Sequence, residues 1–507
     1  MDPMTDRVRV SSRPPESPVA FWVCIGYLGL CLVLGGGTRQ ALVAEGLLQL
    51  LALPVLAWGA LRLSWEAQPK AAFWLAVWAA LVIGWLATQL IPLPPSWWSA
   101  LAGRESLAAE LAFAGVDQRW RPISLDWQTS VRALFAWLPL LALGLLVLGL
   151  TSRQRVNVLR FLLAAAVAAA LLGLAQLSTG PDSALRWHEI TNQYAAVGPF
   201  ANRNHLATFL ASLLPLGAAA FLAATDGSPE RRPLRLTLAI LAGVVILVGL
   251  AMTRSRAGVA VGCLSLLGVV VMAWSWRRWR HRMDAPIHGL RAWVFVAALV
   301  IGFLLVQYAL VGLLRSFDKD AMEDRRWSIA EMTLEVIEET GRLGTGGGTF
   351  PLVYGAFEPA EQRGDSYVNR AHNDWLEWWL EGGIPLFLLM LAGLAWLGVA
   401  SWQAFRIHRN DAIWFQAASV GAWVILVHSL FDYPLRTTAM NVTMAALLVC
   451  VAKSAQPVRR SRRKSRRDPF DPPLDRDTGD IPRTASHRAD EPSARQLARH
   501  RRQPSRH

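Results

Sequence analysis

The sequence predicts an all-α polytopic membrane protein, because long apolar runs recur through most of its 507 residues. Hydrophobic residues make up 53% of the chain, and charged residues only 17%. Runs such as LLQLLALPVLAWGALRL and LTLAILAGVVILVGLAM lack the polar face that the helices of a soluble protein show at helical spacing. Each run has about 17–20 residues, which is enough to cross roughly 30 Å of hydrocarbon as a helix.

The hydropathy pattern predicts about twelve spans. They are expected to begin near Val19, Ala41, Ala71, Val131, Val156, His205, Leu236, Ala257, Ala292, Gly382, Ala412 and Thr437. An even number of spans puts both ends of the chain on one side. The alternate loops on that side are short and basic, which marks it as the cytoplasmic side of the membrane. These basic loops are Thr151–Arg155, Asp226–Arg235, Trp276–Arg291 and Trp402–Asp411.

The opposite, periplasmic side is expected to carry most of the polypeptide outside the membrane. It holds Pro92–Ser130, Ser178–Asn204 and a large loop, Arg315–Glu381, which is expected to contain short helices. Long loops cross the membrane largely regardless of their charge, so their arginines do not oppose this orientation. The working surface of the protein is therefore expected on this side.

The two ends of the chain differ from its middle. Residues 1–18 form a short cytoplasmic segment, and residues 453–507 form a basic tail rich in Arg, Pro and Ser. The tail has too few apolar residues to fold alone and is expected to be disordered. Its run RRSRRKSRR follows soon after the last span, where attraction to anionic lipid headgroups is the simplest explanation. Nucleic-acid binding is not expected, because no folded module accompanies the basic run.

Topology is the first testable prediction. Reporter fusions at Asp365 and after Lys453 are expected to report periplasm and cytoplasm respectively, because Lys and Arg density alternates in that order along the loops. A cytoplasmic signal at Asp365 would contradict the expectation that the large loop and the working surface are periplasmic.

A polar cluster opens the span that follows the second outer loop. In GPFANRNHLATFL, Asn202, Arg203, Asn204 and His205 stand together at the expected membrane face. Asn amides and an Arg fork can hydrogen-bond sugar hydroxyls or phosphate oxygens. The alternative is a polar helix start in which an Asn caps free backbone N–H groups.

The segment MTRSRAG places Arg254 and Arg256 between two apolar runs with almost no loop. An arginine close to membrane depth is costly unless it is paired, so it is a functional candidate. A lipid diphosphate at the headgroup plane is a natural partner. The alternative is a tight hairpin whose arginines extend to the interface.

The large loop contains DRRWSIAEMTLEVIEETG, which predicts an amphipathic helix that stops at Gly341. Its apolar face is expected to contain Trp327, Ala330, Leu334 and Ile337. Arg325 and Arg326 lie in its first turn. The GTGGGTF segment that follows lacks the Lys and Ser or Thr of a nucleotide-binding loop, so it is either a bare turn or a phosphate cradle.

The loop ends in NRAHNDWLEWWLEGGIP, where His372 stands among polar neighbours. Arg370, Asn373 and Asp374 surround it, and Trp375 and Trp379 are expected to share one helical face with it. A histidine beside an apolar interfacial face can act as a base near neutral pH. A purely structural histidine is the alternative.

Two further patches raise the question of a metal. In HSLFDYPLR, His428 and Asp432 stand four residues apart and are expected to hydrogen-bond if the segment is helical. Asp318 and Asp320 form an Asp-x-Asp triplet, a weak signal in so polar a loop. The four cysteines lie in apolar runs and favour neither a disulfide nor a thiolate site. We expect no metal and no cofactor.

The ordered series of these motifs resembles the O-antigen ligase and polymerase family of bacterial envelope proteins. The matching pieces are GPFANRNHLATFLASLLPL, TRSRAG at the start of a span, RRW, GTGGGTF and AHNDWLEWWLEGGIPLFLL. The resemblance covers about residues 198–452, with the loop 315–381 between two late spans, whereas residues 19–197 match in hydropathy alone.

The resemblance implies transfer of a glycan from a polyprenyl diphosphate carrier to an acceptor hydroxyl, without a metal. The acceptor is lipid A–core in ligases, another carrier-linked repeat in polymerases, and a protein in some relatives. His372 would activate the acceptor or position the diphosphate. The residues implied in substrate binding are Arg203, Asn204, Arg256, Arg325, Arg326, Arg370 and Asn373. The doubled arginine leaves open which of Arg325 and Arg326 is functional.

A lipid-linked sugar transporter is the alternative from another class. It would also have many spans and membrane-depth arginines, but with broken helices in mid-membrane and paired repeats. Here the polar residues lie in outer loops and at span ends, which favours an enzyme.

Overall fold

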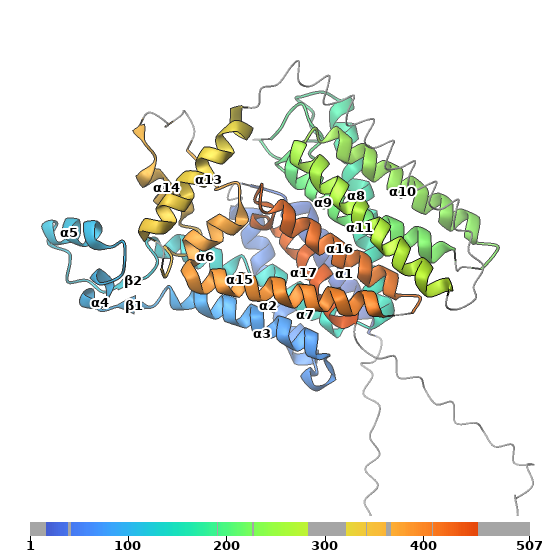
Figure 1. Ribbon diagram of the computed structural model, residues 1–507, viewed down its shortest axis with the longest axis horizontal. Coiled ribbons are helices and arrows are strands. Elements are labelled where there is room, and N and C mark those ends of the chain that lie inside the picture. Colours follow the sequence, from blue (N-terminus) through green and yellow to red (C-terminus); the bar gives the residue numbers. More distant parts are fainter. Residues whose placement is uncertain are drawn as a thin grey trace, which may run out of the picture. The chain divides into compact units, whose positions relative to one another are not determined.

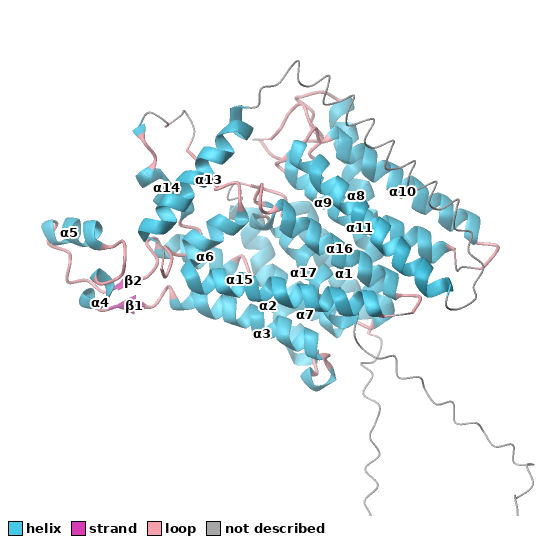
Figure 2. Cartoon of the chain, in the orientation of Figure 1, coloured by secondary structure: helices cyan, strands magenta, loops and turns pink. Residues whose placement is uncertain are grey.

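The structure, a computed structural model, describes residues 17–38, 42–189, 191–225, 228–281, 321–340, 342–360, 363, 367–407 and 409–454. The expected span near Ala292, the Asp318–Asp320 triplet, Gly341 and the tail beyond Ser454 lie outside these residues. The described part is built almost wholly of helices (Figures 1 and 2). Two strands of two residues, β1 (Pro92–Leu93) and β2 (Arg121–Pro122), pair antiparallel, with Pro92 opposite Pro122.

Eight described helical stretches are long and apolar enough to span a membrane, and three apolar helices of 17 residues accompany them. The protein is therefore a multi-pass membrane protein. Eleven of the expected spans coincide with apolar helices. These helices are α1 (Pro18–Leu34), α2 (Leu42–Arg62), α3 (Lys70–Thr88), α6 and α7 (Trp127–Phe135 and Leu138–Gly149), α8 (Ser152–Ser178), α9 (Arg203–Ala224), α10 (Arg232–Met252), α11 (Arg256–His281), α15 (Asp374–Arg406), α16 (Ala412–His428) and α17 (Thr438–Ser454).

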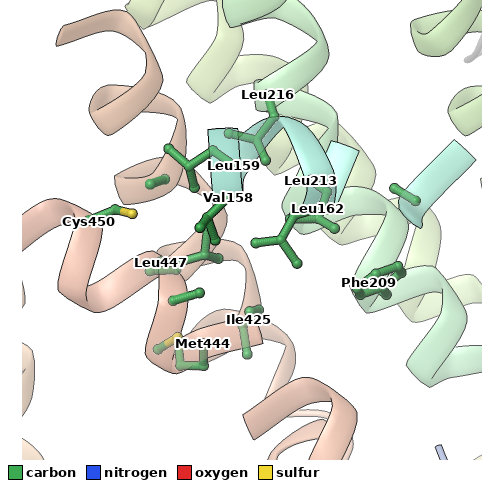
Figure 3. Packing of buried hydrophobic residues seen from close by; sticks show 14 of the residues in the cluster. Val158, Leu159, Leu162, Phe209, Leu213, Leu216, Ile425, Met444, Leu447 and Cys450 are labelled. Atoms are coloured by element: carbon green, nitrogen blue, oxygen red, sulfur yellow. The ribbon is translucent and has the colours of Figure 1, made fainter. Parts of the chain in front are cut away.

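The centre of the bundle is formed by α8, α9, α16 and α17. Figure 3 shows buried side chains of all four helices gathered together, among them Leu159 and Leu162 of α8, Leu213 of α9, Ile425 of α16 and Leu447 of α17. Glycine allows a close approach of two of these helices, because a Cβ on Gly421 of α16 would lie 2.3 Å from the carbonyl oxygen of Ser212 in α9. Small residues at such contacts let helices pack in the absence of a strong hydrophobic drive between them.

Hydrogen bonds connect loops to one another at each end of the bundle. At one end, Ser152 donates to Asp411, which joins two of the expected cytoplasmic segments, and Lys453 donates to Gln68 in the loop between α2 and α3. At the other end, Ala196 donates to Met252 and Asp374 donates to Ser429. We refer to this second end, where α9, α11, α15 and α17 begin, as the site end.

Helix α15 is bent near its start, and its sequence EGGIP explains why. Gly383 adopts φ 65°, ψ −164°, and Pro385 has no N–H to donate. The carbonyl groups that the bend frees find other donors: Gln89 and Gly346 donate to the Glu381 oxygen, and Trp85 donates to that of Gly382. The bend therefore ties α15 to α3 and to the glycine segment of the large loop.

The large loop forms a small helical lobe with its own apolar core. Helices α13 (Ala321–Thr340) and α14 (Phe350–Phe357) pack with α15. The predicted apolar face of α13 is wrong in part, because Trp327 is 70% exposed and Leu334 41% exposed. The buried face instead contains Ile329, Val336 and Ile337, and of these only Ile337 belongs to the predicted face.

Candidate active site

His372 lies just before α15, not within it. The helix begins at Asp374, with Asn373 as its N-cap, whose side chain accepts from the N–H groups of Trp375 (3.0 Å) and Leu376 (3.1 Å). The expectation that His372 shares a helical face with Trp375 and Trp379 is therefore wrong. Its backbone has φ 51°, in the left-handed region that only a few per cent of non-glycine residues adopt. Asn373 thus has a structural role as a cap.

The strained backbone at His372 is held from both sides. Ala371 donates its N–H to the Glu377 carboxylate at 3.0 Å. The Asp374 N–H donates to the Ser429 carbonyl at 2.9 Å, and its carboxylate accepts from the Ser429 hydroxyl at 2.9 Å. Strain of this kind persists only where the surroundings fix it, and it concentrates at functional sites.

Asp432 connects the His372 side chain to an arginine. His372 Nδ1 lies 3.5 Å from one carboxylate oxygen of Asp432, and Arg326 Nη2 lies 3.9 Å from the other. Arg326 also donates through Nη1 to the Phe431 carbonyl at 3.2 Å. The Asp432 side chain is fully buried, and His372 is 8% exposed. A histidine, a carboxylate and an arginine from three distant segments thus meet in one buried centre.

The electrostatics of this centre keep Asp432 charged. Burial alone would raise the pKa of its carboxyl, but the interaction with His372 and the charge of Arg326 outweigh that effect and hold the pKa well below its usual range. Asp432 therefore remains a carboxylate throughout the physiological pH range. A buried carboxylate facing an imidazole nitrogen orients the ring and stabilises its protonated form.

Tyr433 lies between two histidines. Its ring centroid is 5.0 Å from that of His372 and 5.0 Å from that of His205, both edge-to-face. Burial and the adjacent charge of Asp432 raise the pKa of the Tyr433 hydroxyl, which therefore stays neutral. His205 is fully buried, and neither of its ring nitrogens has a hydrogen-bond partner among the described residues.

The predicted pairing of His428 with Asp432 is only partly right. The Asp432 N–H donates to the His428 carbonyl at 3.0 Å, so the two residues are linked through the backbone. The His428 ring instead contacts the Thr208 hydroxyl of α9 through Nδ1. Within the described residues, no three His, Cys, Asp or Glu side chains converge in a way that would hold a metal ion.

The adjacent arginines of α13 point to different partners. Arg326 reaches Asp432, whereas Arg325 lies 3.6 Å from the Glu358 carboxylate beyond α14. The geometry therefore separates two residues that the sequence could not distinguish.

The polar cluster around Arg203 and the MTRSRAG segment each lie at the start of a helix at the site end. The Arg203 N–H donates to Asn192 at 2.9 Å, and buried Asn204 follows it in the first turn of α9. Arg256 is the exposed first residue of α11. Here α9 and α11 pack closely, since a Cβ on Gly258 would lie 2.6 Å from that of Ala207.

Arg254 just precedes α11 and is the second non-glycine residue with positive φ, at 53°. Its Nε is buried without a hydrogen-bond partner among the described residues. The MTRSRAG segment is therefore a tight hairpin, and its backbone is strained at one of its arginines.

The start of α15 carries an ionic network that was not predicted from the sequence. Asp374, Glu377 and Glu381 are spaced by three and four residues, so they share one helical face. Arg436 lies 3.6, 3.4 and 2.8 Å from their respective carboxylates. Arg370 donates to Glu377 at 2.8 Å, so this candidate binding residue already has a partner. The acidic spacing was visible in the sequence, but its cation lies about 60 positions away along the chain.

The glycine segment Gly344–Gly348 packs against protein. A Cβ on Gly344 would lie 2.3 Å from the Glu381 carbonyl oxygen, and one on Gly346 would lie 2.4 Å from the Ser124 hydroxyl. Gly344, Gly346 and Gly348 all have positive φ. The close approach and backbone conformation fully explain these glycines, so the structure favours the turn over a phosphate cradle.

The fold and the buried centre together define a multi-pass membrane protein with a His–Asp–Arg constellation at one end of its bundle. Residues 241–391 match the family model described as O-antigen ligase, so this part of the chain is similar to that family. The matched stretch contains Arg256, Arg326 and His372 but ends before Asp432. No curated protein matches the chain.

Proposed function

We propose that the protein is a metal-independent glycosyltransferase of the bacterial inner membrane. It transfers a glycan from a polyprenyl diphosphate carrier to an acceptor hydroxyl at the periplasmic face. The observation that carries this proposal is the contact of His372 and Arg326 with the same buried carboxylate, Asp432. The similarity of residues 241–391 to the O-antigen ligase family supports the same class of reaction.

The proposed reaction needs two functions, and the centre has groups for both. The acceptor oxygen forms a bond to the anomeric carbon of the donor sugar, while the bond from that carbon to the diphosphate oxygen breaks. The acceptor proton passes to the free nitrogen of neutral His372, and Asp432 stabilises the imidazolium that results. The polyprenyl diphosphate leaves as an anion, which arginines can stabilise through paired hydrogen bonds.

Arg326 is the best-placed group for the leaving diphosphate, because it lies next to the His372–Asp432 pair. Arg203, Arg254 and Arg256 stand at or beside helix starts at the same end, and we propose that they complete the donor site. The first turn of a helix also offers free backbone N–H groups to an anion.

Two experiments test the proposal at different levels. Purified protein in liposomes is expected to move glycan from a polyprenyl diphosphate donor onto an acceptor, and the absence of turnover with every tested pair would count against an enzyme. A deletion strain identifies the acceptor. Full-length glycan left on the carrier indicates a ligase that acts on lipid A–core, whereas single repeats indicate a polymerase. Loss of protein-linked glycan alone indicates a protein O-oligosaccharyltransferase.

A further inference from the structure

His428 is the last residue of α16, and its carbonyl group holds the turn that carries Asp432. This carbonyl accepts the N–H groups of Phe431 at 2.9 Å and of Asp432 at 3.0 Å. A shift of the end of α16 would therefore move the Asp432 carboxylate away from His372, which lies 3.5 Å from it. The position of Asp432 thus depends on what holds His428.

The His428 ring is held by a threonine of the neighbouring helix. His428 is fully buried, and its Nδ1 contacts the Thr208 hydroxyl of α9. The same hydroxyl donates its single proton to the Asn204 carbonyl at 2.8 Å. Both contacts are hydrogen bonds only if Nδ1 carries the proton of the neutral ring and donates it to the Thr208 oxygen.

The second ring nitrogen of His428 favours the same tautomer. Nε2 is buried and has no hydrogen-bond partner among the described residues. A buried N–H without an acceptor is costly, so the proton is better placed on Nδ1, where Thr208 accepts it. Thr208 therefore fixes both the orientation and the tautomer of the ring.

The contact between Thr208 and His428 lies at the end of a closely packed interface between α9 and α16. One turn farther along α9, the Ser212 carbonyl oxygen would lie 2.3 Å from a Cβ on Gly421 of α16. Gly421 and His428 are seven residues apart, so they lie on the same face of their helix. Close packing along this face brings the Thr208 hydroxyl to the last residue of α16, immediately before the turn.

We propose that Thr208 and His428 are positioning residues. Their hydrogen bond fixes the end of α16 and thereby places the Asp432 carboxylate against His372. The importance of this placement for glycan transfer rests on the proposed function, whereas the anchoring of the turn does not.

The main variant is Thr208→Val, which keeps the shape of the side chain but removes the hydroxyl. Its kcat for transfer by the full-length protein in liposomes is expected to fall at least about tenfold, with KM within about twofold. The reason is that a misplaced His372–Asp432 pair weakens the transition state more than it weakens substrate binding. Thr208→Ser keeps the hydroxyl and is expected to stay within about threefold of the wild-type rate.

Thr443→Val is the matched control. The Thr443 hydroxyl is also fully buried and also donates to a carbonyl four residues earlier, that of Ala439 at 2.8 Å, but in α17. This variant loses the same hydroxyl within a helix and leaves the anchor of the turn intact. It is expected to keep the transfer rate within about twofold.

The Asp432→Asn background tests whether Thr208 acts through that carboxylate. When Thr208→Val is added to Asp432→Asn, the further loss of rate is expected to be no more than about threefold, because the group that Thr208 helps to place is already absent. A purely structural role of Thr208 would instead lower the rate by the same factor in both backgrounds.

Hydrogen–deuterium exchange in lipid nanodiscs tests the anchoring without any turnover. It follows the peptide that contains the Phe431 and Asp432 amides. Thr208→Val is expected to speed their exchange about tenfold, and Thr208→Ser is expected to leave it unchanged, since a buried hydrogen bond opposes local opening. Wild-type exchange along the rest of α9 and α16 shows that the variant is folded, and Thr208→Ala replaces any valine variant that is not.

Four outcomes overturn the inference: a wild-type rate for Thr208→Val, a Thr208→Ser variant as slow as Thr208→Val, equal losses with and without Asp432, or unchanged exchange of the turn. Wild-type protein that transfers glycan while any of these is observed keeps the proposed function and loses the positioning role. Wild-type protein without turnover loses the proposed function, and the exchange rates alone then decide whether Thr208 anchors the turn.

Discussion

The His372→Ala variant is expected to lose about 10²- to 10⁴-fold of its glycan-transfer rate, the usual cost of removing a general base. The physical reason is that no other imidazole contacts the Asp432 carboxylate directly among the described residues. The measurement is transfer of lipid-linked glycan by purified protein in liposomes, normalised to the amount of inserted protein. Retention of more than about a third of the wild-type rate would show that His372 is structural.

His188→Ala is the matched control for this variant. His188 also lies at the site end, in the loop before α9, but its ring contacts the Pro199 carbonyl at 3.2 Å. It is expected to keep the transfer rate within about twofold, as do most surface substitutions away from a site. His372→Gln adds a further distinction, because glutamine can hydrogen-bond but cannot take up a proton at neutral pH. A base role predicts that this variant is as slow as His372→Ala.

The Arg326→Lys variant is expected to lose about 10- to 100-fold of the transfer rate, whereas Arg325→Lys stays within about twofold. Lysine keeps the charge but loses the planar fork with which Arg326 contacts both the Phe431 carbonyl and the Asp432 carboxylate. Arg325 provides the matched control, because it is the neighbouring residue on the same helix and pairs with Glu358. Equal effects of the two substitutions would contradict the assignment of Arg326 to the centre.

The spans were predictable because burial in a membrane requires a long apolar run in each segment by itself. Every backbone polar group must be satisfied within the helix, so each span needs an unbroken apolar run. The bend of α15 was equally local, since Gly383 and Pro385 encode it. These features require no knowledge of what a segment packs against.

The faces of helices and the members of the centre were harder to predict, because they depend on partners far along the chain. Helix α13 carries apolar residues on more than one side, and contact with α14 and α15 decides that Ile329 and Val336 are buried while Trp327 is not. Asp432 and Arg436 reach their partners from the turn between α16 and α17, a connection that no local pattern indicates. The correct start of α15 was within reach, since Asn373 followed by Asp374 is a common helix start.

The most direct test of the centre is the rate of transfer by Asp432→Asn at neutral pH, measured in liposomes beside the wild type. Asparagine has the same shape and can still accept the Tyr433 N–H, which the carboxylate accepts at 2.9 Å, so folding is expected to survive. Without the negative charge, the imidazolium that His372 forms during transfer loses its partner, so the variant is expected to be slower than the wild type at neutral pH. A wild-type rate would contradict a catalytic pairing of His372 with Asp432.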